Sequence, residues 1–263
     1  MSRTYVITGA ASGIGRATAE LLRQQGHQVV GVDLRGSDLD VDLAGAQQRA
    51  ALADLVRKRT GDHVDGVVAV AGLSLPDPLT VRVNYFGALA TLEALQPLLR
   101  RSAAPRAVVV ASFSALQDND TELVELLRDG DEDAAVARAA HLVDADRGHL
   151  IYPSTKRAVA ERVRSLSITD AWAGVGIPLN AVGPGVVLTA MTEPLMATEE
   201  GRAQLTAAVP MPLHGPAEPV VVARTLAWLT SEENSHITGQ VVFVDGGADV
   251  AVRGPRVFDT CRP

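Results

Sequence analysis

Short apolar runs rich in β-branched residues alternate along this chain with stretches of helical periodicity, and this alternation limits the possible folds more than any other feature. Each run is apolar almost without interruption, which is typical of a strand covered on both faces of its sheet. The alternation predicts an α/β fold, a doubly wound parallel sheet with right-handed crossovers. The expected strands are Thr4–Thr8, Gln28–Asp33, Gly66–Val70, Ala107–Ser112, Gly176–Ala181 and Gln240–Asp245. The expected helices are Gly13–Gln25, Gly45–Arg59, Thr80–Arg101, Tyr152–Ala173 and Ala217–Leu229.

Two places interrupt the alternation. Because Asp42 follows Asp33 by only nine positions, a strand at Leu39–Val41 must be short and reached by a loop. The second interruption, residues 116–149, is interpreted as an inserted helical hairpin that turns at Asp129-Gly130. No repeat or linker divides the chain, so residues 1–263 are expected to form a single domain. The expected hairpin helices are about Thr121–Arg128 and Asp131–Leu142.

Composition excludes several classes of protein. Of the 263 residues, 47% are apolar and 21% charged, which rules out a disordered or fibrous chain. The apolar runs are shorter than the ~20 residues that cross a bilayer, and a net charge of −7 argues against a nucleic-acid partner. Tyr5 follows the start without a basic stretch or cleavage site, so no export signal and a cytoplasmic location are expected. The one cysteine, Cys261, excludes an internal disulfide and a cysteine-based zinc site, and no metal is expected.

A glycine-rich segment, Thr8–Gly15, follows the first strand and opens the first helix. Its spacing is Gly-x3-Gly-x-Gly, with glycine at positions 9, 13 and 15. Glycines let the backbone approach a pyrophosphate closely, and the helix N-terminus offers unpaired N–H groups to it. No Gly-Lys-Ser/Thr follows, which excludes a P-loop. The segment therefore predicts a dinucleotide site.

Asp33 ends the second strand, eighteen residues after Gly15. A carboxylate at this place can accept hydrogen bonds from both ribose hydroxyls of an adenosine, and its charge repels a 2′-phosphate. NAD is therefore favoured over NADP. Arg16 and Arg35 lie nearby in the sequence, and a guanidinium binds phosphate well, so the preference stays open to test.

Tyr152 and Lys156 form the most specific signal for chemistry. Four residues apart on a helix, the two side chains share a face, and an ammonium group beside a phenol lowers the pKa of that phenol. Ser112 closes the predicted fourth long strand, at the carboxyl edge where doubly wound sheets bind ligands. Asn84 lies inside a predicted helix, whose interior disfavours asparagine, and marks either a local bend or a water site.

In this order along nearly the whole chain, these motifs resemble the short-chain dehydrogenase/reductase family. Further matching features are Pro184-Gly185 with Thr189, and Asp245-Gly246-Gly247. Within the family, the segment Gly26–Arg35, the short connection that follows it, Val83–Ala88 and the long insertion before Tyr152 resemble the bacterial 3α-hydroxysteroid dehydrogenase/carbonyl reductases. The resemblance implies a Rossmann-type fold and hydride transfer between a nicotinamide and a substrate carbon.

The same resemblance implies a role for each site residue. Tyr152 would be the general acid/base, and Lys156 would lower its pKa and hold the nicotinamide ribose. Ser112 would polarise the substrate oxygen, and Asn84 would hold a water that relays protons through Lys156. The residues implied in cofactor binding are Gly9, Gly13, Ile14, Gly15, Asp33, Asp42, Leu43, Gly72, Tyr152, Lys156, Val187 and Thr189.

Two departures from the family pattern stand out. The family usually carries Asn-Asn-Ala-Gly after its fourth strand, whereas this chain has Ala69-Val70-Ala71-Gly72; the change raises the question of how that turn is held but removes no catalytic group. Ser112 matches the family serine better than Ser114, which remains an alternative.

The segment 186–215 is expected to lie over the cofactor as a substrate loop. It holds three of the four methionines, which suit irregular apolar ligands. A bulky apolar alcohol or ketone, steroid-like or aryl, is therefore expected, with Ser114, Met191, Leu195 and Met196 as candidate contacts. One alternative is an aryl-alcohol dehydrogenase of the coniferyl-alcohol type. The other is a regulatory protein that senses NAD without turnover. The hairpin enters beside a helix through which relatives pair, so a homodimer is favoured over a tetramer.

Overall fold

The computed structural model describes residues 2–260, so Cys261 lies outside the described residues. Seven parallel strands form one sheet in the order β3-β2-β1-β4-β5-β6-β7. The chain leaves β1 in one direction to β2 and returns to β4 on the other side, so a switch point lies between β1 and β4 at the carboxyl edge. The strands are β1 (Thr4–Thr8), β2 (Gln28–Asp33), β3 (Leu39–Asp40), β4 (Gly66–Ala69), β5 (Arg106–Val110), β6 (Leu179–Pro184) and β7 (Val241–Val244).

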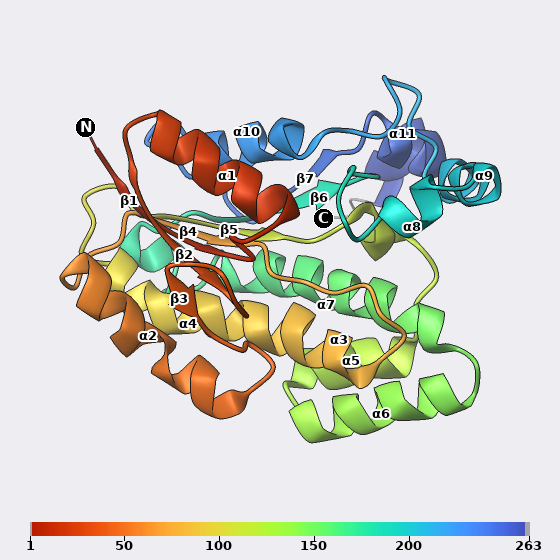
Figure 1. Ribbon diagram of the computed structural model, residues 1–263, viewed down its shortest axis with the longest axis horizontal. Coiled ribbons are helices and arrows are strands. Elements are labelled where there is room, and N and C mark those ends of the chain that lie inside the picture. Colours follow the sequence, from red (N-terminus) through yellow and green to blue (C-terminus); the bar gives the residue numbers. More distant parts are fainter. Residues whose placement is uncertain (1, 261–263) are drawn as a thin grey trace.

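Helices cover both faces of this sheet (Figure 1). α1 (Gly13–Gln24) and α10 (Pro219–Leu229) lie on one face, and α2 (Ala46–Thr60), α4 (Ala88–Leu99) and α7 (Ile151–Leu166) on the other. Both faces are buried in apolar clusters, which is why the strands are continuously apolar. The predicted doubly wound α/β sheet is confirmed. The short helices α8 (Glu193–Met196), α9 (Glu199–Ala208) and α11 (Ala248–Arg253) gather beyond the carboxyl edge.

The predicted helix 80–101 is three segments rather than one. α3 (Pro78–Val81) leads into a π-helical turn, Arg82–Gly87, and this turn leads into α4. Asn84 lies in the π-helical turn and is 1% exposed. Of the two interpretations that the sequence left open, the local bend is therefore present. π-Helical turns of this kind redirect side chains at functional sites.

Three other predicted boundaries are wrong. β6 begins at Leu179 instead of Gly176, because Gly176 takes a left-handed conformation (φ 77°) and Pro178 follows it. α7 ends at Leu166, because the hydroxyl of Thr169 bonds the Leu166 carbonyl and competes with the helix. β5 ends at Val110, so Ser112 follows the strand and opens the 3₁₀ turn Phe113–Leu116 instead of closing the strand.

Two helices occupy the region 116–149. α5 (Thr121–Asp129) ends at Gly130 in a left-handed conformation (φ 79°), and α6 (Glu132–Asp144) follows at once. The carboxylates of Asp120 and Asp131 cap the two N-termini by accepting from Leu123 and Ala134 N–H groups. β3 is short and reached by a loop, as predicted. The remaining 3₁₀ turns are Gly148–Leu150, Ala173–Val175 and Pro255–Thr260.

Within residues 2–260, no helix has both the length and the apolar content needed to cross a bilayer.

Candidate active site

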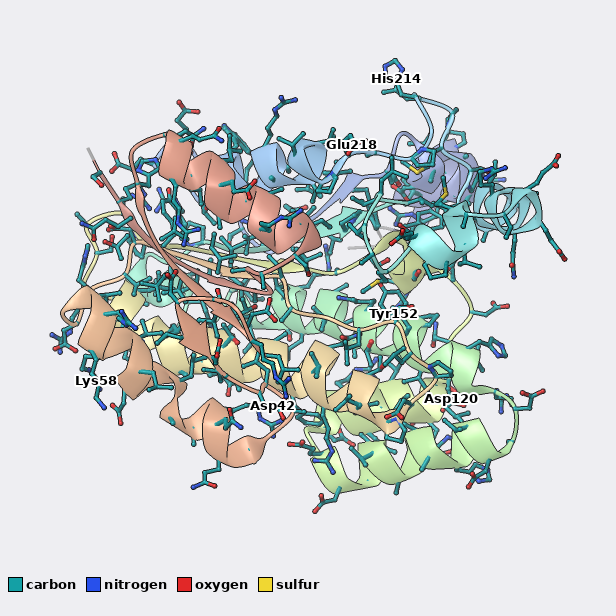
Figure 2. The ribbon with its side chains drawn as sticks, viewed as in Figure 1. Asp42, Lys58, Asp120, Tyr152, His214 and Glu218 are labelled. Atoms are coloured by element: carbon teal, nitrogen blue, oxygen red, sulfur yellow. The ribbon has the colours of Figure 1, made fainter. Side chains whose placement is uncertain are left out.

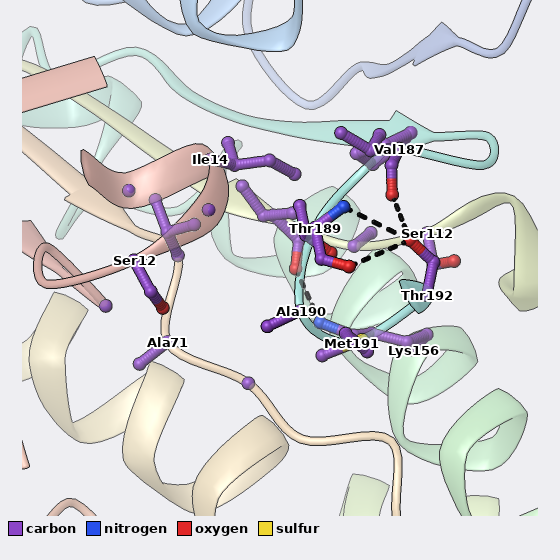
Figure 3. A pocket seen from close by; sticks show the side chains of 18 of the residues that line it. Ser12, Ile14, Ala71, Ser112, Lys156, Val187, Thr189, Ala190, Met191 and Thr192 are labelled. Carbon is purple, nitrogen blue, oxygen red and sulfur yellow. Dashed lines mark hydrogen bonds between the residues drawn. The ribbon is translucent and has the colours of Figure 1, made fainter. Parts of the chain in front are cut away.

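A cleft of about 880 Å³ opens at the carboxyl edge beside the switch point (Figure 3). Strand ends of β1, β4, β5 and β6, the start of α1 and the first turns of α7 form its walls. Figure 2 places Tyr152 toward this edge and Lys58 at the opposite one. The predicted site residues that line the cleft are Gly9, Gly13, Ile14, Gly15, Gly72, Ser112, Tyr152, Lys156, Val187, Thr189 and Met191.

The glycine-rich segment makes one wall of the cleft out of backbone. Gly9 has φ 69°, and a Cβ there would lie 2.9 Å from the Ala71 nitrogen. A Cβ at Gly15 would overlap the Gly9 carbonyl. Because side chains do not fit at these two positions, the N-terminus of α1 and its free N–H groups face the cleft directly. This backbone wall fits the pyrophosphate of a dinucleotide.

Asp33 lies beside the glycine-rich segment. One of its carboxylate oxygens accepts from Ala11 N–H at 2.9 Å and the other from Leu34 N–H at 2.7 Å. Each carboxylate oxygen has two acceptor positions, so the group retains capacity for two further hydroxyl donors. Asp33 therefore both holds the loop and remains able to bind a diol.

Asp42 and Leu43 follow β3 and do not line the cleft. The Asp42 carboxylate accepts from Ala44 N–H at 2.9 Å. Leu43 is buried and packs against Gly87, where a Cβ would lie 3.0 Å from the Leu43 side chain. Leu43 is therefore a core residue that packs against the last residue of the π-helical turn. The loop after β3, which holds Asp42 and Leu43, lies on the same side of the sheet as Asp33.

The turn after β4 is held by side chains other than the missing asparagines. The hydroxyl of Thr8 accepts from the N–H groups of Val70 and Ala71, at 3.0 and 3.2 Å. The amide of Asn84 brackets Leu73, accepting from its N–H at 2.7 Å and donating to its carbonyl at 2.8 Å. Nothing in the sequence singled out Thr8 for this task, since its partners are 62 and 63 positions away.

Asn84 also donates to the Thr155 hydroxyl at 3.2 Å, which commits both amide hydrogens. Its carbonyl oxygen keeps one acceptor position and lies beside Gly72, near the Lys156 ammonium. Asn84 therefore ties the turn after β4 to α7 and still offers one position to a water.

Ser112, Tyr152 and Lys156 meet at the mouth of β5. Burial raises the pKa of the Tyr152 phenol, and a hydrogen bond with the Ser112 hydroxyl lowers it. The Lys156 ammonium lies 5.7 Å from the centre of the Tyr152 ring and donates to the Val110 carbonyl at 2.9 Å. Burial lowers the pKa of Lys156 to about 8. The predicted triad is thus brought together, with a protonated phenol at neutral pH.

This burial makes Lys156 costly for the folded protein. Its pKa falls from 10.5 to about 8 on folding, so the unfolded chain binds more protons between these values and stability rises with pH across this window. We expect the Lys156→Met variant to raise the free energy of unfolding by roughly 2 kcal/mol at about pH 7, part of the relief being offset by the lost Val110 bond. Urea unfolding of both proteins should show this difference shrinking by about pH 10. An equal difference at both pH values would contradict the burial cost.

The segment after β6 closes the cleft from above. The Thr192 hydroxyl donates to the Val187 carbonyl at 2.6 Å and accepts from Thr189 N–H at 3.2 Å, which fixes the turn (Figure 3). Met191 and Leu195 are 46% and 41% exposed, and Met191 lines the cleft. Thr192 and Ser12 line the cleft although the sequence did not single them out; a hydroxyl residue shortly after Thr189 was the available signal.

Two other predicted substrate contacts lie elsewhere. Met196 packs with Phe113 in a small apolar cluster beneath the segment 186–215, and it is not among the residues that line the cleft. Ser114 donates its backbone N–H to the Ser112 hydroxyl at 3.1 Å, so it helps to orient the Ser112 side chain.

The region 116–149 is tied to the start of α7. The buried Asp120 carboxylate accepts from Arg138 at 2.7 and 3.0 Å, and these bonds hold the pKa of Asp120 below its usual value. The Asp120 N–H donates to the Ser154 hydroxyl at 2.9 Å. Because Ser154 lies between Tyr152 and Lys156, this contact helps hold the first turn of α7 in place. Among residues 2–260, no group of three or more His, Cys, Asp or Glu side chains is arranged to hold a metal ion.

A backbone cradle for a dinucleotide beside a Ser–Tyr–Lys cluster defines an oxidoreductase that acts on CH–OH groups with a nicotinamide cofactor. The chain belongs to the short-chain dehydrogenase/reductase family. Residues 3–123 match the family model described as short chain dehydrogenase, and residues 135–249 match the one described as enoyl-(acyl carrier protein) reductase.

Similar proteins cover almost the whole chain. The 3-alpha-hydroxysteroid dehydrogenase/carbonyl reductase of Comamonas testosteroni is 34% identical over 254 residues, 94% of this chain and 97% of that protein. A 3-oxoacyl-[acyl-carrier-protein] reductase of Thermotoga maritima is 31% identical, over 93% and 97% of the two chains. The crystal structure of the 3-alpha-hydroxysteroid dehydrogenase from Pseudomonas sp. B-0831 complexed with NADH superposes with a TM-score of 0.87 at 37% identity, covering 96% and 99% of the two chains.

Proposed function

We propose that this protein is an NAD-dependent oxidoreductase that interconverts a hydrophobic secondary alcohol and its ketone, with a hydroxysteroid-like compound as substrate. The observation that carries the proposal is the meeting of Ser112, Tyr152 and Lys156 in the same cleft as the glycine wall. The names of the relatives from Comamonas and Pseudomonas support the substrate class. A nicotinamide bound in this cleft would supply or accept the hydride at its C4 atom.

The side chains of the cleft handle the proton. In reduction the neutral Tyr152 phenol donates to the carbonyl oxygen, and in oxidation it accepts the alcohol proton. The Ser112 hydroxyl orients the same oxygen. Lys156 holds the nicotinamide ribose, and its positive charge favours the phenolate formed in reduction. Asn84 keeps the turn after β4 in place and offers its free acceptor position to a relay water.

The proposed preference for NAD rests on Asp33. Its carboxylate has spare acceptor positions for the ribose hydroxyls, and its charge opposes a 2′-phosphate. The NADH bound to the Pseudomonas relative supports this assignment. Asp42 and Leu43 would border the adenine, Gly13, Ile14 and Gly15 would contact the phosphates, and Gly72, Val187 and Thr189 would lie along the nicotinamide half.

The substrate assignment rests on the exposed apolar side chains of the segment 186–215, which we propose as the substrate loop of a single domain. Met191 offers a flexible apolar contact at the cleft, and Leu195 is exposed on the same segment without lining the cleft. An absorbance assay of reduced nicotinamide with NAD and NADP, across steroid and aryl alcohols and ketones, tests the proposal. Turnover best on steroids supports it, and turnover best on aryl alcohols favours the coniferyl-alcohol type. Binding of NAD without turnover of any alcohol would favour the NAD-sensing alternative.

We also propose a homodimer. α5 packs along α7, so this hairpin covers one side of a helix through which relatives pair. A tetramer mass in solution would contradict the dimer.

Glu132, at the start of α6, is expected to position the adenine side of the cofactor site. Its two oxygens bind Arg49 at 2.5 Å and Arg82 at 2.9 Å, and Arg49 donates to the carbonyls of Leu43 and Ala44, each at 3.2 Å. The Glu132→Gln variant leaves Arg49 without its counter-charge and loosens the loop that holds Leu43 and Ala44. We expect KM for NAD to rise about tenfold at nearly unchanged kcat, because the Ser112–Tyr152 end is untouched.

Turnover with nicotinamide mononucleotide, which has no adenosine, distinguishes a local effect at the adenine side from a general loss of structure, because a general loss would lower the rate with both cofactors. Turnover with this truncated cofactor should be equal in the Glu132→Gln variant and the wild type. Glu125→Gln, an exposed position of α5 with the same charge change, is the matched control. Equal losses with both cofactors would show that Glu132 supports the fold and not the adenine side.

A further inference from the structure

A second pocket of about 730 Å³ lies away from the cleft, and no residue lines both. It is an open pocket lined by residues of α2, of the π-helical turn and the start of α4, of the turn between α5 and α6, and of α7. We call it the helix pocket. Its lining residues are Arg49, Tyr85, Phe86, Leu89, Ala90, Glu93, Arg128, Asp129, Gly130 and Arg162.

Tyr85 brings a buried phenol to this pocket. The residue is 1% exposed, and within residues 2–260 no hydrogen-bond partner is present for its hydroxyl. Burial raises the pKa of Tyr85, and the charges that act on its hydroxyl include those of Arg162, Glu93 and Arg128, all of which line the pocket. The phenol therefore stays neutral and can donate a hydrogen bond at the pocket.

Arg162 brings an uncompensated guanidinium. Its Nε is buried, and none of the described residues accepts a hydrogen bond from it or pairs a carboxylate with this side chain. The other two arginines of the pocket are already neutralised, Arg49 by Glu132 at 2.5 Å and Arg128 by Glu161 at 2.7 Å. One free planar cation thus lies with one free hydroxyl donor, and together they match a single carboxylate.

The remaining walls narrow the ligand further. Phe86, Leu89 and Ala90 give an apolar wall along α4, which suits a small hydrocarbon or aromatic body. Glu93 and Asp129 place negative charge at the exposed rim, which opposes a second negative charge on the ligand. We propose that the helix pocket binds a small organic acid with one carboxylate, held by Arg162 and Tyr85, and with its apolar body along Phe86 and Leu89.

Calorimetric titration of the full chain with benzoate tests this proposal, with benzamide as the neutral counterpart of the same shape. Benzoate should bind and benzamide should bind at least tenfold more weakly. Saturating NADH should leave benzoate affinity unchanged, since the two pockets share no residue. Inorganic phosphate should bind more weakly than benzoate, because it lacks the apolar body and carries more charge.

Variants locate the site. Arg162→Gln should weaken benzoate binding at least tenfold, and Tyr85→Phe several-fold, while Arg164→Gln, an exposed position on the same helix with the same charge change, should have no effect. Thermal unfolding confirms that each variant is folded, and Arg162→Lys, which keeps the charge but not the planar fork, provides a second test and should bind with reduced affinity. Equal binding of benzoate and benzamide, competition by NADH, or wild-type affinity in Arg162→Gln would overturn the proposal. So would a change of oligomeric mass in Arg162→Gln, which would assign the pocket to contact between copies of the chain.

Discussion

We expect the Tyr152→Phe variant to lose turnover by about a thousandfold while binding NAD and NADH as the wild type does. A positioned acid or base accounts for roughly 10²–10⁴ of an enzymatic rate, and the Tyr152 hydroxyl is the only group of the proposed mechanism that exchanges a proton with the substrate oxygen. The variant keeps the ring, its packing and the glycine wall of the cleft, so cofactor affinity should not change. Initial rates and the fluorescence of bound NADH measure the two quantities separately.

Tyr5→Phe is the matched control for this loss. Tyr5 is buried at the start of β1, at the edge of the sheet opposite the cleft, where its hydroxyl accepts from Arg3 at 3.1 Å. Removing that hydroxyl should cost stability but leave kcat unchanged. Tyr152→Phe turning over at more than about a tenth of the wild-type rate would refute Tyr152 as the acid/base and turn attention to Ser112.

The sheet was predictable because each strand is a compact apolar run bounded by turn residues. β1 and β2 begin and end where the sequence places them. β6 was placed three residues early, because Gly176 and Ile177 extend the apolar pattern although the backbone there is still turning. Apolar pattern reports burial, whereas the start of a strand depends on φ angles that the pattern does not report.

Some residues of the candidate site could be predicted from the sequence and others could not. Gly9, Gly15 and the Tyr152–Lys156 pair lie within short segments whose spacing alone specifies their chemistry. Contacts between residues far apart in the sequence could not be predicted from spacing. Examples are the hydrogen bonds by which Thr8 holds the turn after β4 and the one between Asp120 and Ser154, 34 positions apart. The helix pocket is of this second kind, since Arg162 and Tyr85 become neighbours only when α7 packs against the π-helical turn.

Cofactor preference is expected to reverse in the Asp33→Ala variant. Removing the carboxylate deletes two charge-assisted bonds to the ribose hydroxyls, each worth about 1.5–3 kcal/mol, and kcat/KM with NAD should fall about a hundredfold or more. The same change removes the repulsion of a 2′-phosphate and leaves Arg35, which is exposed at the end of β2, available to it. The ratio of kcat/KM for NAD to that for NADP should therefore change by at least a hundredfold.

Asp33 also accepts from the N–H groups of Ala11 and Leu34, so its loss loosens the glycine-rich segment as well. Loosening alone would weaken NAD and NADP equally, whereas loss of the carboxylate charge changes their ratio, and the ratio is therefore the quantity that separates the two effects. Asp40→Ala, which removes an exposed negative charge from the neighbouring strand β3, should leave the ratio unchanged. A fall in efficiency with both cofactors at constant ratio would mean that Asp33 shapes the loop and that another group discriminates between NAD and NADP.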